Sequence, residues 1–184
     1  MPSVLVTGAG RGIGKAIDEH LASRGWDVIA GICNERDATA VTALNPQRIS
    51  SVTLDVTDSE HIAALTESLP ERLDAIVNNA GVVVSGPMET VTTDEWRKQL
   101  EINVIGQIAV TRAVLPRLRA SHGRVVFISS VNGRLSMPLI GAYCASKPRA
   151  RYVVGVGPKL QVALMTKLPA WARDRVLRRV SGQP

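Results

Sequence analysis

The chain has 184 residues, of which 45% are hydrophobic and 21% are charged. This composition is typical of one globular domain with a sizeable core, and it excludes intrinsic disorder and a fibrous repeat. No uninterrupted run of about 18 apolar residues occurs, so we expect no transmembrane helix. No basic segment precedes the first apolar run, which argues against a secretory signal.

The net charge of +6 is distributed unevenly. Residues 1–147 contain 14 Lys and Arg against 15 Asp and Glu, a net charge of −1. Residues 148–184 contain 8 Lys and Arg against one acid, a net charge of +7. We therefore predict a main domain over 1–147 and a basic tail over 148–184. The few aromatic residues do not alternate with basic ones, so we expect no nucleic-acid partner.

The two cysteines, Cys33 and Cys144, are far apart in the sequence. They form neither a disulfide framework nor a metal-binding pattern. We expect two free thiols in the reducing cytoplasm and no metal site.

The first 130 residues alternate between short apolar runs and helical patterns. A strand over 4–6 leads through a glycine-rich turn into a helix, in which Ile13, Ile17 and Leu21 repeat every four residues and Gly25 marks the end. Further strands are predicted over residues 27–32, 51–54, 73–77 and 124–128.

Helices are predicted between these strands. One covers residues 37–44, and Thr57–Glu60 and Thr92–Glu95 fit capping boxes that begin two more. The last of these reaches about residue 119, and Pro116 should bend it or end it locally. The alternation predicts an α/β fold: one domain with a doubly wound parallel sheet, helices on both faces and a switch point after the first strand.

The turn after the first strand reads Thr7-Gly8-Ala9-Gly10-Arg11-Gly12-Ile13-Gly14. Glycines let the backbone turn sharply and approach a pyrophosphate, and a helix N-terminus supplies unpaired N–H groups. It is not a P-loop for nucleoside triphosphates because no Gly-Lys-Ser/Thr follows, and Ile13 occupies the last glycine position of G-x-G-x-x-G. A simple tight turn is the alternative, but the strand–turn–helix context favours phosphate binding.

The spacing Thr-Gly-x-x-x-Gly-x-Gly resembles that of the short-chain dehydrogenase/reductase family, whose fold is Rossmann-like. Further matches follow in that family's order: Asp55-Val56, Asn78-Asn79-Ala80-Gly81, Asn103, Ser129-Ser130 and Tyr143-x-x-x-Lys147. The resemblance covers residues 3–147. It implies a dinucleotide site formed by Gly8, Arg11, Gly12, Ile13, Gly14, Asp55, Val56, Asn79, Ala80, Gly81, Tyr143 and Lys147.

The catalytic group implied by the resemblance has a physical rationale. Tyr143 and Lys147 are four residues apart, so they share a face of a helix, and an adjacent ammonium favours a tyrosinate. The resemblance implies that Tyr143 exchanges a proton with the substrate oxygen, Ser130 holds that oxygen, Lys147 binds the ribose and Asn103 positions a relay water. The alternatives are a Ser130 that terminates a strand or caps a helix, an Asn103 that is a satisfied polar group in a helix interior, and an Asp55 that only begins the next helix.

The resemblance implies NAD(P) as the cofactor. An acidic residue at the end of the second strand would hydrogen-bond the ribose 2′-hydroxyl and favour NAD. Residues 31–34 contain no acid, so Glu35 would have to reach the ribose for this interaction to form. Arg11 could meet a 2′-phosphate, so we predict NADP in preference to NAD. Cys33 stands where related sequences often have a basic residue, and the absence of that residue argues against NADP. The alternative for Arg11 is a solvated loop residue with no role in cofactor binding.

The resemblance ends at Pro148, as if an internal block of the family's sequence had been deleted after Lys147. Proline removes a helical hydrogen bond, so we expect Lys147 to leave helical geometry. A strand over 150–154 is predicted to pair with the fifth strand, and residues 158–180 are predicted to be helical with a break at Pro169.

The predicted function is oxidation or reduction of a small-molecule alcohol or carbonyl compound with NAD(P), by a Ser-Tyr-Lys mechanism. The alternative is a catalytically impaired protein of the same fold that binds a dinucleotide or a partner. Contact of the basic tail with an anionic membrane surface is a third interpretation, less favoured than packing on the domain because Pro169 divides the tail. The sequence is compatible with a homo-oligomer but does not predict the oligomeric state. The expected location is the cytoplasm.

Overall fold

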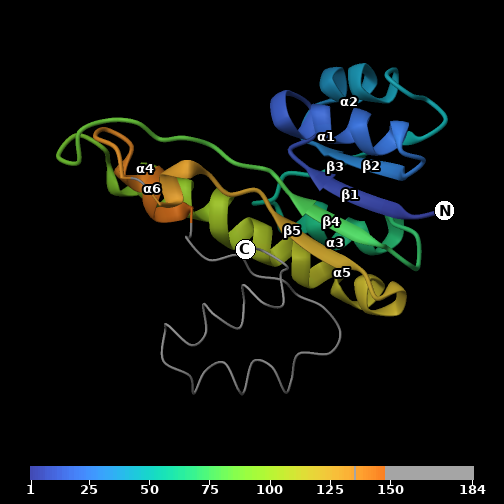
Figure 1. The fold of residues 1–184 in the computed structure, drawn as a ribbon. Coiled ribbons are helices and arrows are strands. Elements are labelled where there is room, and N and C mark those ends of the chain that lie inside the picture. The colour runs from blue at the N-terminus through green and yellow to red at the C-terminus, as the bar shows by residue number, and fades with distance from the viewer. Residues whose placement is uncertain (135, 148–184) are drawn as a thin grey trace, which may run out of the picture. The chain divides into compact units, whose positions relative to one another are not determined.

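The computed structural model describes residues 1–134 and 136–147 (Figure 1). The predicted strand over 150–154, its pairing with the fifth strand, the helix over 158–180 and the membrane interpretation of the tail lie outside these residues. In the described part of the chain, no helix is both long enough and apolar enough to span a bilayer.

Five parallel strands form one sheet in the order β3-β2-β1-β4-β5 (Figure 1). The chain begins at the centre of the sheet and winds outward in both directions, which confirms the prediction of a doubly wound α/β fold. Each of the five strands predicted over residues 4–128 is present, with ends that differ by at most two residues. The strands are β1 Ser3–Thr7, β2 Asp27–Ile32, β3 Ile49–Thr53, β4 Ala75–Asn78 and β5 Arg124–Phe127.

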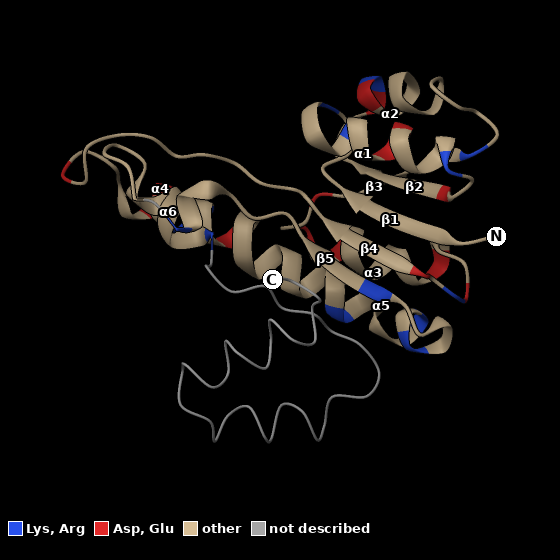
Figure 2. Cartoon of the chain, viewed as in Figure 1, with Lys and Arg blue, Asp and Glu red and all other residues tan. Residues whose placement is uncertain are grey.

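Helices cover both faces of the sheet. Figure 1 shows α1 and α2 on one side and α3 and α5 on the other. Alternate strand residues pack into two clusters: Leu5 and Ile76 lie in one, and Val4 and Val6 lie in the other. The strands carry few charged residues, as burial on both faces requires (Figure 2). The helices before residue 100 are α1 Gly12–Ser23, α2 Glu35–Thr42, α3 Ser59–Ser68 and α4 Thr93–Leu100.

The buried face of α1 differs from the apolar repeat that predicts the helix. The residues buried against the sheet are Gly14, Asp18 and Ala22, whereas Ile13 is 64% exposed. The repeat of Ile13, Ile17 and Leu21 therefore predicts the helix but not which of its residues are fully buried. Small residues on the inner face bring the helix close to the strands, and the larger Ile17 packs at the edge of the core.

The two capping boxes have different outcomes. The Thr92 hydroxyl accepts from the Glu95 N–H at 3.3 Å and the Glu95 carboxylate accepts from the Thr92 N–H at 2.8 Å, which confirms that box. Helix α3 instead begins from Asp58, whose carboxylate accepts two N–H groups of the first turn. The Thr57 hydroxyl donates to the Asp55 carboxylate, so the box predicted at Thr57 is wrong.

The long helix predicted to reach residue 119 contains a π-helical turn, η1 (Glu101–Gly106). It continues as α5, Gln107–Ser121. Pro116 lies inside α5, so this proline does not end the helix. After β5 come a short 3₁₀ helix, η2 (Val131–Gly133), and α6 (Gly141–Ser146).

Candidate active site

The glycine-rich turn joins the carboxyl end of β1 to α1, and its shape requires glycine. Gly8 and Gly12 have φ angles of +64° and +56°. A Cβ at Gly8 would lie 2.8 Å from the Cα of Ala80, and one at Gly14 would lie 2.3 Å from the carbonyl oxygen of Gly8. Arg11 is the N-cap residue of α1, and its side chain makes no capping hydrogen bond to the helix. The first N–H groups of α1 are therefore available to an anion.

The end of β4 is fastened to this turn by side-chain hydrogen bonds. The Thr7 hydroxyl accepts from the N–H groups of Asn79 at 3.1 Å and Ala80 at 3.0 Å. The Asn79 amide donates to the carbonyl oxygens of Thr7 and Gly8, both at 3.0 Å. Asn79 thus holds the glycine turn in place through its side chain.

A cavity of about 580 Å³ runs along the carboxyl ends of the strands, within the size range of small-molecule sites. It brings together most of the predicted site residues. Those on its wall are Gly8, Arg11, Ile13, Asp55, Val56, Asn79, Ala80, Gly81, Tyr143 and Lys147. Those not on its wall are Gly12, Gly14, Asn103 and Ser130.

An acid that the sequence analysis did not consider lies on the cavity wall. It is Asp37, in the first turn of α2, and not Glu35. The Asn34 amide donates to the Asp37 carboxylate at 2.9 Å, and the Asn34 amide oxygen accepts from the Asp37 N–H at 2.9 Å. A Cβ at Gly10 would lie 2.8 Å from the carboxylate, so Asp37 lies against the glycine turn.

Three buried amide side chains hold the extended segment over residues 80–84. They lie four residues apart along α4, η1 and α5, and we call them the amide series: Gln99, Asn103 and Gln107. The hydrogen bonds are Gln107 Nε2 to Ala80 O at 2.6 Å, Asn103 Nδ2 to Val82 O at 3.0 Å, Val82 N to Asn103 Oδ1 at 2.9 Å, Gln99 Nε2 to Val82 O at 2.8 Å and Val84 N to Gln99 Oε1 at 2.7 Å. The sequence analysis missed Gln99 and Gln107, which position this wall of the cavity.

Asn103 connects the amide series to α6. Its amide nitrogen also donates to the Ser146 hydroxyl at 2.9 Å, and that hydroxyl donates to the carbonyl oxygen of Tyr143 at 2.8 Å. Both amide hydrogens of Asn103 are therefore used inside the protein. In this structure Asn103 is a satisfied polar group that positions α6, and it lies in the type of π-helical turn that often occurs at functional sites.

Lys147 and Tyr143 lie together on the cavity wall. The Lys147 Nζ is 5.7 Å from the centre of the Tyr143 ring and donates to the carbonyl oxygen of Ile128 at 3.1 Å. Helix α6 ends at Ser146, and Lys147 has an extended backbone with φ −110° and ψ 94°, as the sequence predicts. Burial lowers the pKa of Lys147, whose side chain is buried. A cation in this low-dielectric position acts strongly on the adjacent ring.

Ser130 acts as a helix cap. Its hydroxyl accepts from the Asn132 N–H at 3.2 Å and donates to the Asn132 side-chain oxygen at 3.2 Å, at the start of η2. The neighbouring Ser129 is the serine on the cavity wall. The structure thus brings Tyr143 and Lys147 to the cavity, but not Ser130.

Comparisons with known proteins agree with this arrangement. A family model described as short chain dehydrogenase matches residues 2–152. Retinol dehydrogenase 16 of Homo sapiens is 38% identical over 150 residues, covering 78% of this chain and 47% of that protein. The 17-beta-hydroxysteroid dehydrogenase type 6 of Homo sapiens is 36% identical over 150 residues, with the same coverage. The crystal structure of a short-chain dehydrogenase from Streptomyces avermitilis matches with 38% identity and a TM-score of 0.73, covering 79% of this chain and 55% of that chain.

The chain belongs to the short-chain dehydrogenase family, which confirms the resemblance and the Rossmann-like fold. It spans about half the length of the curated relatives it matches. The predicted internal deletion begins at Pro148, outside the described residues.

Proposed function

We propose that this chain is an oxidoreductase that moves a hydride between NAD(P) and an alcohol or carbonyl compound. The observation that carries the proposal is the position of Tyr143 and Lys147 on the wall of the cavity that also contains the glycine turn. Relatives named as retinol and hydroxysteroid dehydrogenases support the same reaction class.

The residues present fit a dinucleotide. Side chains at Gly8 and Gly14 would collide with neighbouring atoms of the protein, so glycine at these positions allows the close turn that brings the N-terminus of α1, with Arg11 and Ile13, to the cavity where a pyrophosphate would bind. In the proposed complex the glycine turn holds the pyrophosphate, and Asp55 and Val56 lie at the adenine. The segment from Asn79 to Gly81 and the Lys147 side chain lie at the nicotinamide end.

The cofactor supplies the site that gives or takes the hydride. The Tyr143 hydroxyl gives or takes the proton at the substrate oxygen. The Lys147 ammonium stabilises the tyrosinate, and its bond to the Ile128 carbonyl oxygen fixes its position. For Ser130 to hold the substrate oxygen, its hydroxyl must leave the cap of η2.

NADP is the proposed preferred cofactor, and Arg11 on the cavity wall supports it, since a guanidinium suits a 2′-phosphate. Asp37 lies on the same wall and repels a phosphate. The proposed preference for NADP therefore depends on the attraction of the Arg11 guanidinium for the 2′-phosphate being stronger than the repulsion by the Asp37 carboxylate.

A second candidate function is dinucleotide binding without turnover. The capping position of Ser130 and the extended backbone of Lys147 favour it, because both depart from the arrangement that the mechanism needs.

Calorimetric titration with NADPH and then NADH tests the proposal. We expect a dissociation constant in the roughly micromolar range for at least one, followed by turnover of a short-chain alcohol or ketone. Tyr143→Phe should leave cofactor binding unchanged and reduce turnover by at least about 100-fold, because it removes the acid–base group. Cys144→Ser, on the same helix, is the matched control and should retain turnover.

The outcomes separate the two candidates. A folded protein that binds neither dinucleotide would refute both. Binding without turnover in the unmodified chain would refute the oxidoreductase and support the second candidate.

A further inference from the structure

The loop between β3 and α3 forms part of the wall of the cavity at the carboxyl ends of the strands. Leu54, Asp55 and Val56 line the cavity in this loop. The backbone N–H of Asp55 donates to Nδ1 of His61 at 3.3 Å. His61 lies in the first turn of α3 and not on the cavity wall, so it contacts the wall through the Asp55 backbone.

A second possible partner lies beside the same ring nitrogen. Asp58 is the N-cap residue of α3, and one oxygen of its carboxylate is 3.6 Å from Nδ1 of His61. The other oxygen accepts from the N–H groups of Glu60 at 2.8 Å and His61 at 3.2 Å. The His61 N–H, followed by the Glu60 N–H, holds the pKa of the Asp58 carboxyl below its usual range. Asp58 therefore stays ionised at the pH values where a histidine changes charge.

The proton on Nδ1 decides which of the two partners the ring has. An Nδ1 that accepts from the Asp55 N–H belongs to a neutral imidazole with its hydrogen on Nε2. A protonated Nδ1 is a donor, so it opposes the Asp55 N–H and suits the Asp58 carboxylate. The His61 side chain is 37% exposed, so protons from solvent reach it. Histidine changes charge between about pH 5 and about pH 8.

The bonds of Asp55 show what this exchange of partners would release. The Asp55 carboxylate accepts from the Thr57 N–H at 2.9 Å and from the Thr57 hydroxyl at 2.7 Å. The Asp55 carbonyl oxygen accepts from the Asp58 N–H at 3.1 Å. These bonds stay within the turn over residues 55–58, whereas the bond to His61 joins the turn to α3. Loss of the His61 bond therefore loosens the turn from the helix.

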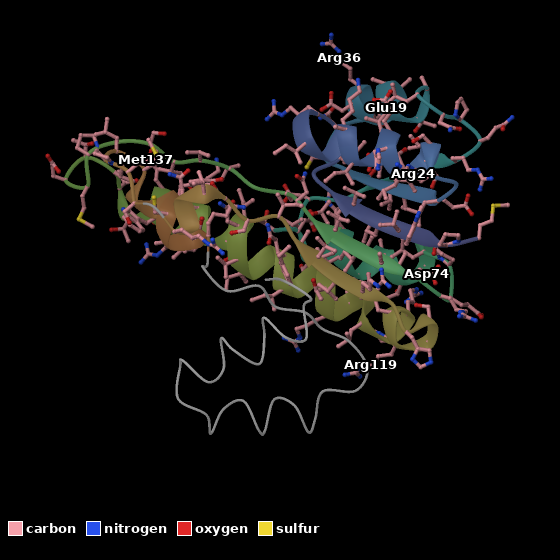
Figure 3. The ribbon with its side chains drawn as sticks, in the orientation of Figure 1. Glu19, Arg24, Arg36, Asp74, Arg119 and Met137 are labelled. Atoms are coloured by element: carbon pink, nitrogen blue, oxygen red, sulfur yellow. The ribbon has the colours of Figure 1, made fainter. Side chains whose placement is uncertain are left out.

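The charges around His61 come from few elements in the described part of the chain. The elements that pack most closely against α3 are β3 and α5, and β3 has no ionisable side chain. Arg117 of α5 donates to two carbonyl oxygens at the end of α3 opposite His61. Figure 3 shows Asp74 and Arg119 at the amino-terminal edge of the sheet, whereas the cavity lies at the carboxyl edge. The charges that face the ring are therefore the carboxylates of the loop and of the first turn of α3.

We propose that His61 is a pH-sensitive positioning residue of the dinucleotide site: its neutral ring holds Asp55 and Val56 in the binding arrangement, and its protonation releases them. This inference rests on the proposed function and adds the regulation of the same site. Acid moves the bond of the ring from Asp55 to Asp58, so two alternative hydrogen bonds define two states of the wall. Dinucleotide affinity should fall about fivefold between about pH 8 and about pH 5, as expected for one hydrogen bond.

Calorimetric titration of the full chain with NADH and with NADPH, in steps from about pH 8 to about pH 5, tests the proposal. His61→Asn is the matched control, because the Asn side-chain oxygen accepts from the Asp55 N–H in place of Nδ1 and does not titrate. The affinity of the unmodified chain divided by that of His61→Asn cancels the titration of other groups and of the dinucleotide phosphates. This ratio should fall about fivefold towards acid. A ratio that does not change with pH would overturn the proposal.

Two further variants distinguish the exchange of partners from a structural role of His61. His61→Leu removes the acceptor, so its affinity relative to His61→Asn should be low at every pH. Asp58→Asn keeps a capping acceptor but removes the charge that attracts a protonated ring, so affinity should begin to fall at a lower pH than in the unmodified chain. An Asp58→Asn profile identical to that of the unmodified chain would contradict the exchange of partners.

The amide proton of Asp55, followed by NMR without dinucleotide, separates this inference from the proposed function. Its resonance should move between about pH 8 and about pH 5 in the unmodified chain and stay nearly constant in His61→Asn. A moving resonance in a protein that binds neither dinucleotide would support the exchange of partners and refute the proposed function. Dinucleotide binding with a constant resonance and a constant affinity ratio would refute the role of His61 and leave the proposed function supported.

Discussion

The two edge strands of the described sheet, β3 and β5, differ in what they expose. The exposed positions of β3 are Ser50, Ser51 and Thr53, as expected of an edge in contact with water. In β5, Val126 is 42% exposed and Phe127 is 36% exposed. Within the described residues β5 pairs with β4 alone. β3 therefore has the composition of an edge strand, whereas β5 has the composition of an interior strand.

The largest expected effect concerns the core between these edges. Asp18 is fully buried in α1, and among the described residues neither of its carboxylate oxygens has a hydrogen-bond partner. Desolvation raises the pKa of Asp18 from 3.8 to about 8. In the unfolded chain the Asp18 carboxyl loses its proton above about pH 4, whereas in the folded chain it keeps the proton up to about pH 8. The free energy of unfolding should therefore fall as the pH rises from about 4 to about 8. The loss reaches about 4 kcal/mol at pH 7 as an upper bound.

Asp18→Asn tests this effect, because it keeps the shape and removes the ionisation. Urea unfolding at pH 5 and pH 8 should show a smaller pH dependence for the variant than for the unmodified chain. Asp18→Ala should also raise the stability at pH 8, since it removes the buried polar group. Parallel pH dependences for Asp18→Asn and the unmodified chain would contradict the assignment.

The next prediction compares the same truncation at the centre and at the β5 edge. Val6, in β1, is fully buried, and Val126, in β5, is partly exposed. Val6→Ala should reduce the free energy of unfolding by about 2 kcal/mol, through lost burial and a residual cavity. Val126→Ala should change it by less than about 0.5 kcal/mol. Equal losses in chemical unfolding would show that Val126 is covered in solution.

The smallest effect is expected on NADPH affinity, at Arg11 and Asp37 on the wall of the cavity at the carboxyl ends of the strands. Arg11→Ala should weaken NADPH binding about fivefold and leave NADH binding nearly unchanged, because the lost ion pair is exposed to solvent. Asp37→Asn keeps the acceptor for Asn34 and removes the charge, so it should strengthen NADPH binding by a similar factor. Calorimetry with both dinucleotides measures the two changes. A matching loss of NADH affinity in Arg11→Ala would place Arg11 at the pyrophosphate and not at a 2′-phosphate.

The sheet and the glycine turn could be predicted because their signals are local. Apolar runs between turn residues define the strands, and the Thr7–Gly14 spacing defines the turn. The position of Asp37 was within reach, since Asn34 is a strong N-cap residue and predicts a helix that begins at Glu35. The helix predicted over 37–44 begins two residues later than α2, which starts at Glu35.

Other features depend on contacts that no local pattern contains. The inward face of α1 is set by how closely Gly14 lets the helix approach the glycine turn and the Asn79 side chain, a contact that the apolar repeat beginning at Ile13 does not contain. The polar residues Gln99 and Gln107 are visible in the sequence, but their partner is an extended segment with no periodic signal. The capping role of Ser130 depends on the local path of the chain after β5.

The amide series has a geometric consequence for the length of two segments. Four residues of regular α-helix advance about 6 Å, and two residues of extended chain advance about 6.6 Å. Although η1 departs from the regular α-helical rise, the two steps are close enough for side-chain amides four residues apart to serve alternate residues of the segment over 80–84, as a neighbouring strand would. One residue inserted or removed in either segment would move every later amide off its partner. This connection, although it joins a strand to a helix, should therefore tolerate changes of side chain far better than changes of length.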